Sequence, residues 1–370
     1  MANQSDILIL TAGFGEGHNS AARNLESAFE GKNNPLYLDP CAAGSPRLND
    51  FLRKFYRYIT THHPRLWYSI YQSTENHDFS KERLPFMRPP ERRLDLAIRH
   101  YQPRAIISTY PLYPYFVDRS FQKGAPRCPV FTVVTDSINI NAAWRNAPTD
   151  YFLVTDETTK ESLIDQKIPA EKIIITGFPV NPKFAQLPVL QPDCSTEKFK
   201  ILYFTTAKKP QVRRILKALL ERHPHTQVTV VLGKNVRKLY SRAREAKEQF
   251  PGRVKIIGWT KRVPELMSEH HLVVGKAGGA TVHEALAAAC PMLIHHLVPG
   301  QEEGNLELLK LLGGGDLADT SDKLRELIHQ LLENDAALWR KMKSELYARR
   351  HPQAATDIVE LVNQSVVAEQ

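Results

Sequence analysis

The feature that most constrains this chain is a regular alternation of short aliphatic and β-branched runs with longer amphipathic stretches. Such alternation is typical of βαβ units, in which a parallel sheet is covered by helices on both faces. We expect strands at residues 7–11, 35–39, 105–108, 130–135, 151–155 and 173–176, and a second series at 200–205, 227–232, 254–257, 272–274 and 291–295. The predicted fold class is therefore α/β.

A proline-rich segment separates the two series of strands. It begins with Pro179-Val-Asn-Pro182 and continues through Pro188 and Pro192. Because proline interrupts both helices and central strands, we interpret residues 181–198 as a linker. The expected organisation is an N-terminal domain at 1–180, a C-terminal domain at 199–345, and a helical tail at 346–370 that packs back toward the first domain. Two lobes of similar size predict a ligand cleft between them.

The charge and composition exclude several classes of protein. A net charge of +9 suits an anionic partner, which could be nucleic acid, a nucleotide or an anionic lipid surface. The sequence contains no apolar run of the length that spans a bilayer, and its first residues lack the basic flank of a secretory signal. Neither the four cysteines nor the histidine doublets have metal-ligand spacing. We therefore expect a cytoplasmic protein without a metal.

A first glycine cluster, Gly13-Phe-Gly15-Glu-Gly17-His18, lies between a predicted strand and a helix. Backbone N–H groups at such a turn form a site for an anion or another ligand. A dinucleotide fingerprint would use Asp39 at the end of the next strand, but His18 stands where its third glycine is required. Two further interpretations stay open. The glycines could simply permit a tight turn, or His18 could be a functional base, since imidazole accepts a proton near neutral pH.

A second glycine cluster repeats this pattern in the C-terminal half. Gly278 and Gly279 follow a predicted strand and would let the backbone approach a phosphate, while the helix expected near Thr281 supplies the positive end of its dipole. Thr281 and Glu284 also have capping-box spacing, which alone would explain the glutamate. Beyond the next strand come Gln301 and Glu302, at the carboxyl edge where open α/β sheets bind ligands.

These residues resemble those of a known enzyme family. The run Gly278-Gly279-Ala280-Thr281-Val-His-Glu284, with Pro299-Gly-Gln301-Glu302 and Asn305 after it, is similar to the nucleotide-sugar signature of a family of glycosyltransferases. Its members include monogalactosyldiacylglycerol synthases, processive diacylglycerol glucosyltransferases and the N-acetylglucosaminyltransferase that makes peptidoglycan lipid intermediate II.

The first half of the chain resembles the diacylglycerol branch of this family. The similarity lies in Gly15-Glu-Gly17-His18-x-x-Ala21-Ala22, in Thr135-Asp136 followed by Trp144 and Asp150, and in Ile175-Thr-Gly-Phe-Pro-Val180. The resemblance implies a GT-B fold, with two Rossmann-like lobes facing a central cleft. It also implies a UDP-sugar donor bound by the C-terminal lobe, an acceptor toward the N-terminal lobe, and no cofactor or metal.

The resemblance also implies roles for individual residues. Gly278 and Gly279 would face the diphosphate beside Ala280 and Thr281, Glu284 would face the ribose, Gln301 and Glu302 the transferred sugar, and the turn from Gly258 to Val263 the uracil. Arg262 or Lys276 would stabilise the departing UDP. His18 would be the base or an acceptor ligand near Gly15 and Gly17, with Asp136 as the competing base.

A stretch at residues 51–71 interleaves aromatic and basic side chains, among them Phe55, Trp67 and Tyr71. It could lie at a bilayer interface or stack the bases of single-stranded nucleic acid. The helical spacing of Phe51, Phe55 and Ile59 also permits a core helix. The resemblance favours a peripheral contact with an anionic inner leaflet, and no nucleic-acid motif is present. Nothing in the sequence specifies an oligomeric state.

The predicted activity is inverting transfer of a hexose, galactose or glucose, from a UDP-sugar to a membrane lipid, which the resemblance identifies as diacylglycerol. The alternatives are transfer to a polyprenyl or soluble acceptor, a UDP-sugar epimerase, and a non-catalytic binder of nucleotide sugars or nucleic acid. An epimerase would convert the donor without any acceptor.

Overall fold

The computed structural model describes residues 6–30, 35–206 and 209–368 of the chain. The first five residues, in which we expect no secretory signal, lie outside this description. Two compact units are formed. The first comprises Met1–Pro182, Pro299–Gly304 and Gln353–Gln370, and the second comprises Lys183–Val298 and Asn305–Pro352. The cleft expected between the two units stays a prediction.

The first unit is built on a six-stranded parallel sheet in the order β2-β1-β3-β4-β5-β6. Its strands are β1 (Ile7–Leu10), β2 (Leu36–Leu38), β3 (Ala105–Ser108), β4 (Val130–Val133), β5 (Tyr151–Val154) and β6 (Ile173–Ile175). The second unit has a six-stranded parallel sheet in the order β12-β11-β10-β7-β8-β9. Its strands are β7 (Phe199–Phe204), β8 (Thr226–Val231), β9 (Val254–Ile257), β10 (Leu272–Lys276), β11 (Met292–His296) and β12 (Gly315–Leu317).

Every strand expected from the sequence is confirmed, with ends that differ by a residue or two. The central strands are buried on both faces and therefore form continuous apolar runs, whereas the edge strands β2, β6 and β9 are partly exposed. β12 was not predicted, because Gly315-Asp-Leu317 is short and partly polar. Counted from its own first strand, the second sheet has the Rossmann order 3-2-1-4-5-6, whereas the first sheet begins 2-1-3. The α/β class and the pair of Rossmann-like lobes are confirmed.

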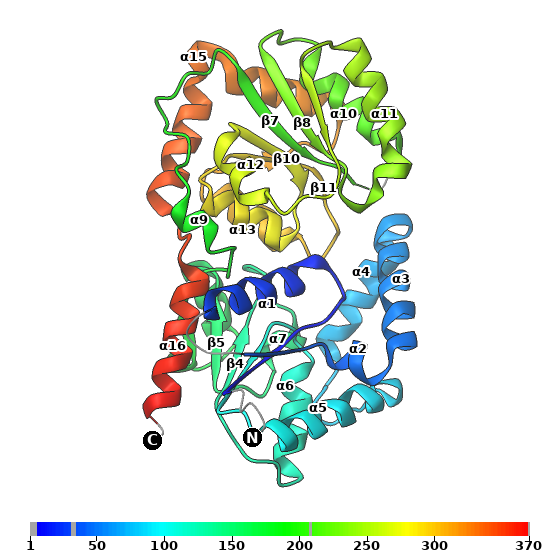
Figure 1. Ribbon diagram of the computed structural model, residues 1–370, viewed down its shortest axis with the longest axis vertical. Helices are drawn as coiled ribbons and strands as arrows, with labels where there is room; N and C mark the ends of the chain where they lie inside the picture. Colours follow the sequence, from blue (N-terminus) through cyan, green and yellow to red (C-terminus); the bar gives the residue numbers. More distant parts are fainter. Residues whose placement is uncertain (1–5, 31–34, 207–208, 369–370) are drawn as a thin grey trace. The chain divides into compact units, whose positions relative to one another are not determined.

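Helices cover both sheets (Figure 1). In the first unit they are α1 (Glu16–Phe29), α2 (Pro40–Gly44), α3 (Pro46–His62), α4 (Pro64–Ser73), α5 (Arg88–Tyr101), α6 (Tyr113–Gln122), α7 (Ala142–Arg145), α8 (Glu157–Asp165) and α16 (Ala354–Ala368). In the second unit they are α9 (Lys183–Gln186), α10 (Lys209–Leu220), α11 (Val236–Gln249), α12 (Val263–Glu269), α13 (Gly279–Ala287) and α15 (Ser321–Arg349), and α14 (Glu303–Leu311) begins in the first unit and continues into the second.

The alternation of side chains along β1 gives the first unit a core on each face of its sheet. Leu8 and Leu10 pack on one face with residues of α5 and α6, and Ile7 and Ile9 pack on the other with α1 and α16. Figure 1 shows α16, in red, beside α1 in dark blue. The end of the chain is therefore part of the first unit's core.

The proline-rich segment packs on the second unit. The backbone N–H of Leu190 donates to the carbonyl oxygen of Ser268 at 3.3 Å, and Arg340 donates to the carbonyl oxygens of Pro192 and Cys194. Residues 183–198 thus cluster with the second sheet. Within the described ranges, no helix combines the length and the hydropathy needed to cross a membrane.

Candidate functional site

The first glycine cluster lies where the strand order of the first sheet reverses. β1 pairs with β2 on one side and with β3 on the other, so the loops after β1 and β3 diverge at the carboxyl edge. Open α/β sheets bind their ligands at such a switch point. His18 lies in the first turn of α1, directly after the loop that follows β1. Its backbone oxygen accepts a hydrogen bond from Thr109 Oγ1, beyond the end of β3, at 3.1 Å.

The His18 imidazole is almost fully enclosed. Its Nδ1 lies 3.0 Å from Thr135 Oγ1, and the ring packs against Tyr110 and Trp144 with centroid distances of 5.2 and 5.8 Å. Burial lowers the pKa of His18 to about 4, because desolvation disfavours the imidazolium, and a hydrogen bond from the ring to the Thr109 backbone opposes this only in part. His18 is therefore neutral at physiological pH.

Asp136 follows β4 and contacts the same Trp144 side chain that packs against His18. Its Oδ2 accepts a hydrogen bond from the indole Nε1 of Trp144 at 2.8 Å. Burial raises the pKa of Asp136 to about 6, with the negative charge of Glu302 acting in the same direction and the Trp144 bond against it. A carboxylate with a pKa close to neutrality has the property expected of a general base.

The loop Pro299–Gly304 brings Gln301 and Glu302 into the first unit. Tyr56 donates a hydrogen bond from its hydroxyl to Gln301 Oε1 at 2.8 Å, and Glu302 is buried. The close approach requires Gly304, at which a Cβ would lie 1.8 Å from the carbonyl oxygen of Ser137. Gln301 and Glu302 thus belong to the same unit as His18, although they lie far from it in the sequence.

The glycines of the first cluster differ in whether the local structure requires glycine. Gly15 has a φ of +101°, which favours glycine, whereas a Cβ on Gly17 would meet no atom within 4 Å. The backbone N–H of Gly13 donates to Asp39 Oδ2 at 3.2 Å, and Asp39 Oδ1 accepts from Ala42 N as the N-cap of α2. Asp39 is thus engaged in holding this loop, which leaves the dinucleotide interpretation without its acidic residue.

The aromatic stretch forms the helix pair α3 and α4 (Figure 1), whose side chains differ in exposure from one face to the other. Phe51 and Phe55 are 63% and 45% exposed and stack on each other, so the interpretation that they belong to a core helix with Ile59 is wrong for both. Ile59 itself is buried. The other exposed apolar side chains of the pair are Tyr58, Leu66, Tyr68 and Ile70.

Trp67 and Tyr71 lie on the inner face of this pair. The edge of Trp67 packs against Tyr56 at 5.0 Å, and Trp67 and Tyr71 lie 6.5 Å apart. Gly300, with a φ of +80°, leaves room for Tyr71, since a Cβ there would lie 2.8 Å from the Tyr71 ring. The structure therefore separates Phe55, which faces solvent, from Trp67 and Tyr71, which support the Pro299–Gly304 loop.

The second glycine cluster lies at the switch point of the second sheet, where β10 and β8 flank β7. Lys276 ends β10, Gly278 is the N-cap of α13, and the helix begins at Gly279. The expected capping box is therefore wrong, because Thr281 lies inside the helix and Gly278 caps it without a side chain. Ala280 and Thr281 belong to the first turn of α13, and Glu284 lies one turn later, so its presence needs an explanation other than capping.

The turn proposed for the uracil follows β9, at the edge of the second sheet. Gly258 allows close packing, since a Cβ there would lie 3.1 Å from Val236 Cγ2. Arg262 precedes α12, its backbone N–H donates to Thr260 Oγ1 at 3.0 Å, and Val263 is the first helical residue. Trp259 in the same turn is 58% exposed. No group of three metal-ligating side chains is found among residues 6–30, 35–206 and 209–368.

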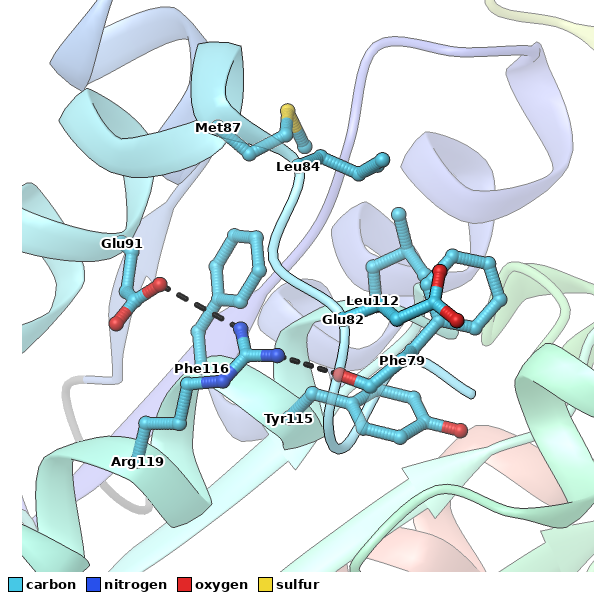
Figure 2. Close-up of a pocket in the computed structure, with 9 residues that line it drawn as sticks. All are labelled: Phe79, Glu82, Leu84, Met87, Glu91, Leu112, Tyr115, Phe116 and Arg119. Carbon is cyan, nitrogen blue, oxygen red and sulfur yellow. Dashed lines mark hydrogen bonds and ion pairs between the residues drawn. The ribbon is translucent and has the colours of Figure 1, made fainter. Parts of the chain in front are cut away.

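A separate pocket lies under the segment that precedes α5 (Figure 2). Its lining is mainly apolar, with Phe79, Leu84 and Phe116 among the residues drawn. Figure 2 shows the Arg119 guanidinium directed at both the Glu91 carboxylate, 3.4 Å away, and the backbone oxygen of Phe79. Arg119 is therefore already paired and joins the segment at Phe79 to α5 and α6, and the residues that line the pocket do not include His18 or Asp136.

Tyr56 is the functional candidate that the sequence prediction missed. It lies within the aromatic stretch, but its partner Gln301 is 245 residues away, so no local pattern links them.

Comparison with known proteins agrees with this geometry. Residues 18–180 match the family described as monogalactosyldiacylglycerol (MGDG) synthase, and residues 206–360 match the glycosyltransferase family 28 C-terminal domain. The chain is 27% identical over 371 residues to a processive diacylglycerol beta-glucosyltransferase of Bacillus cytotoxicus, covering 98% of this chain and 94% of the relative. The corresponding protein of Bacillus thuringiensis is 26% identical with the same coverage.

Solved structures show the same fold at low sequence identity. MurG of Acinetobacter baumannii has a TM-score of 0.64 at 14% identity, with 97% of this chain and 99% of that chain covered. A UDP-GlcNAc 2-epimerase from Neisseria meningitidis, bound to UDP-GlcNAc, has a TM-score of 0.58 at 14% identity with the same coverage. The likeness to a transferase and an epimerase establishes the GT-B architecture but leaves the reaction open. The matched family models and the relatives favour a glycosyltransferase, since the first half of the chain matches the monogalactosyldiacylglycerol synthase family and the second half matches the glycosyltransferase family 28 C-terminal domain.

Proposed function

We propose that this enzyme transfers a hexose from a UDP-sugar to the free hydroxyl of diacylglycerol, with inversion at the anomeric carbon. The observation that carries the proposal is the assembly of His18, Asp136 and Glu302 in one unit, at the switch point of its sheet. The names of the relatives supply the acceptor class, since they are diacylglycerol glucosyltransferases.

We assign the general base to Asp136. Its Oδ2 is held by Trp144, which leaves Oδ1 to take the proton of the acceptor hydroxyl. The new bond joins that oxygen to the anomeric carbon, and the bond between this carbon and the UDP oxygen breaks. His18 has the lower pKa and is the weaker base, so its role is to orient the acceptor hydroxyl.

The donor belongs to the second unit in this proposal. The start of α13, which no side chain caps, directs backbone N–H groups toward the diphosphate, and Lys276 adds positive charge as UDP departs. Glu284 binds the ribose hydroxyls. These groups would stabilise the leaving group without a metal, and the reaction needs no further cofactor.

The exposed face of α3 and α4 provides the attachment to the membrane. Phe51 and Phe55 are exposed, and so are the cations Lys54, Arg57 and Arg65 on the same two helices. Aromatic rings at headgroup depth and cations near anionic lipid both favour a bilayer surface. The enzyme is therefore expected to bind peripherally to an anionic leaflet, where its acceptor resides.

The activity is tested with a panel of UDP-sugars and liposomes that contain diacylglycerol, with the product identified by mass. The expected product is a hexosyl-diacylglycerol, and the Asp136→Asn variant should form it about 10²–10⁴-fold more slowly. Conversion of the donor in the absence of liposomes would favour an epimerase. A product formed only with polyprenyl or soluble acceptors would replace diacylglycerol in the proposal.

Membrane attachment is tested by sedimentation with anionic vesicles. A variant with Phe51→Ser and Phe55→Ser should lose most of its vesicle binding, since each exposed ring contributes apolar area at the interface. The matched control is Tyr240→Ser, because Tyr240 is similarly exposed (47%) but lies on α11 of the second unit. Equal loss in both variants would contradict a specific role for α3.

A further inference from the structure

Tyr56 connects the helix pair α3 and α4 to the loop that carries Gln301. Its hydroxyl donates to Gln301 Oε1 at 2.8 Å. Burial raises the pKa of Tyr56 well above its ordinary value, and the negative charges of Glu302 and Asp136 act in the same direction. The phenol therefore stays protonated at every physiological pH and keeps its role as hydrogen-bond donor.

Both partners of this hydrogen bond are fixed by packing. The Tyr56 ring is held by the edge of Trp67, and its hydroxyl lies 3.9 Å from the place where a Cβ on Gly15 would be. On the other side, Gly300 packs closely on Tyr71. The geometry of the Gln301 carboxamide is thus set by tertiary contacts that reach it from α3 and α4.

We infer that Tyr56 is a positioning residue for the sugar of the donor and that it determines donor specificity. This inference rests on the proposed function and on the role that the family resemblance implies for Gln301, which is to face the transferred hexose. By engaging Oε1, the Tyr56 hydroxyl fixes the rotation of the carboxamide, so that Gln301 presents Nε2 as a donor to a sugar hydroxyl oxygen. Glucose and galactose differ in the orientation of one hydroxyl, and an amide held in one orientation distinguishes them better than one that rotates freely.

The test compares the Tyr56→Phe variant with Tyr58→Phe, a matched control on the same helix whose side chain is 56% exposed. The dissociation constants of UDP-glucose, UDP-galactose and UDP are measured by calorimetry, which requires no acceptor. Tyr56→Phe should lower the affinity for the preferred UDP-hexose about tenfold. The affinities for the other UDP-hexose and for UDP should change less than twofold. The ratio of the two UDP-hexose affinities should therefore fall toward one, and Tyr58→Phe should leave it unchanged.

A double-mutant cycle shows whether Tyr56 acts through Gln301. In a Gln301→Ala background, Tyr56→Phe should produce no further loss of UDP-hexose affinity, because the amide that it orients is gone. If Tyr56 had a merely structural role, Tyr56→Phe would lower the affinities for UDP and both UDP-hexoses alike, or its effect would add fully to the loss of affinity caused by Gln301→Ala.

Three results overturn the inference. They are equal affinity of the unaltered enzyme for both UDP-hexoses, an unchanged affinity ratio in Tyr56→Phe, and additivity in the cycle. Failure of the proposed function is detected separately, as the absence of hexosyl-diacylglycerol in the liposome assay, because the calorimetric affinity ratio is measured without any acceptor.

Discussion

Lowering the pH should remove activity as Asp136 becomes protonated. A general base works only in its deprotonated form, so the rate falls as the pH falls through the pKa of the base. The two candidate bases of this site have well-separated values. Burial raises the pKa of Asp136 to about 6, and burial lowers that of His18 to about 4. The two pKa shifts have opposite signs but the same cause, since desolvation disfavours the charged form of each group.

These values predict a large difference in rate at pH 5. With a pKa of about 6, Asp136 would be about one-tenth ionised at this pH, so kcat/KM should be about a tenth of its plateau. With a pKa of about 4, His18 would be about nine-tenths neutral and the rate would stay close to the plateau. The two assignments therefore differ about tenfold in relative rate.

The assay is a pH profile of kcat/KM between pH 4.5 and 8, with the folded state followed by circular dichroism at each pH. His18→Ala should keep the limb near pH 6 while its plateau falls, and Glu302→Gln should move the limb to lower pH, since the charge of Glu302 helps to raise the pKa of Asp136. Near-plateau activity at pH 5 in the unaltered enzyme would refute the assignment of the base to Asp136.

Three further predictions concern the glycine turns and the donor. Glu284→Ala should weaken UDP binding about 10- to 100-fold by calorimetry through loss of charged hydrogen bonds to ribose, whereas the exposed Glu307→Ala should not change it. Gly17→Ala should leave the Tm unchanged or slightly raised, because its Cβ meets nothing and alanine favours helix, and a decrease in kcat/KM for the lipid alone would show that the free space belongs to the acceptor. Gly304→Ala should lower the Tm by roughly 2–4 °C and reduce transfer, since its Cβ would collide with the Ser137 carbonyl, and an unchanged melting curve would contradict that contact.

Local pattern was sufficient for the strands and for the two glycine turns. Strands buried on both faces are recognisable as apolar runs, as β1 and β10 show with their buried residues. Local pattern was misleading at Thr281 and at Phe51. Capping-box spacing at Thr281 is satisfied by chance inside a helix, and the helical period of Phe51 and Phe55 is the same whether that face meets a core or solvent.

The sequence by itself determined the α/β class, the two series of strands, and the resemblance that indicated a UDP-sugar glycosyltransferase. Each depends on residues close together in the chain or on a motif of fixed spacing. Only the tertiary structure decided the strand orders, the placement of Gln301 in the first unit, and its hydrogen bond to Tyr56. These depend on contacts between distant segments, which are selected by packing and burial over the whole fold and leave no periodic trace in the sequence.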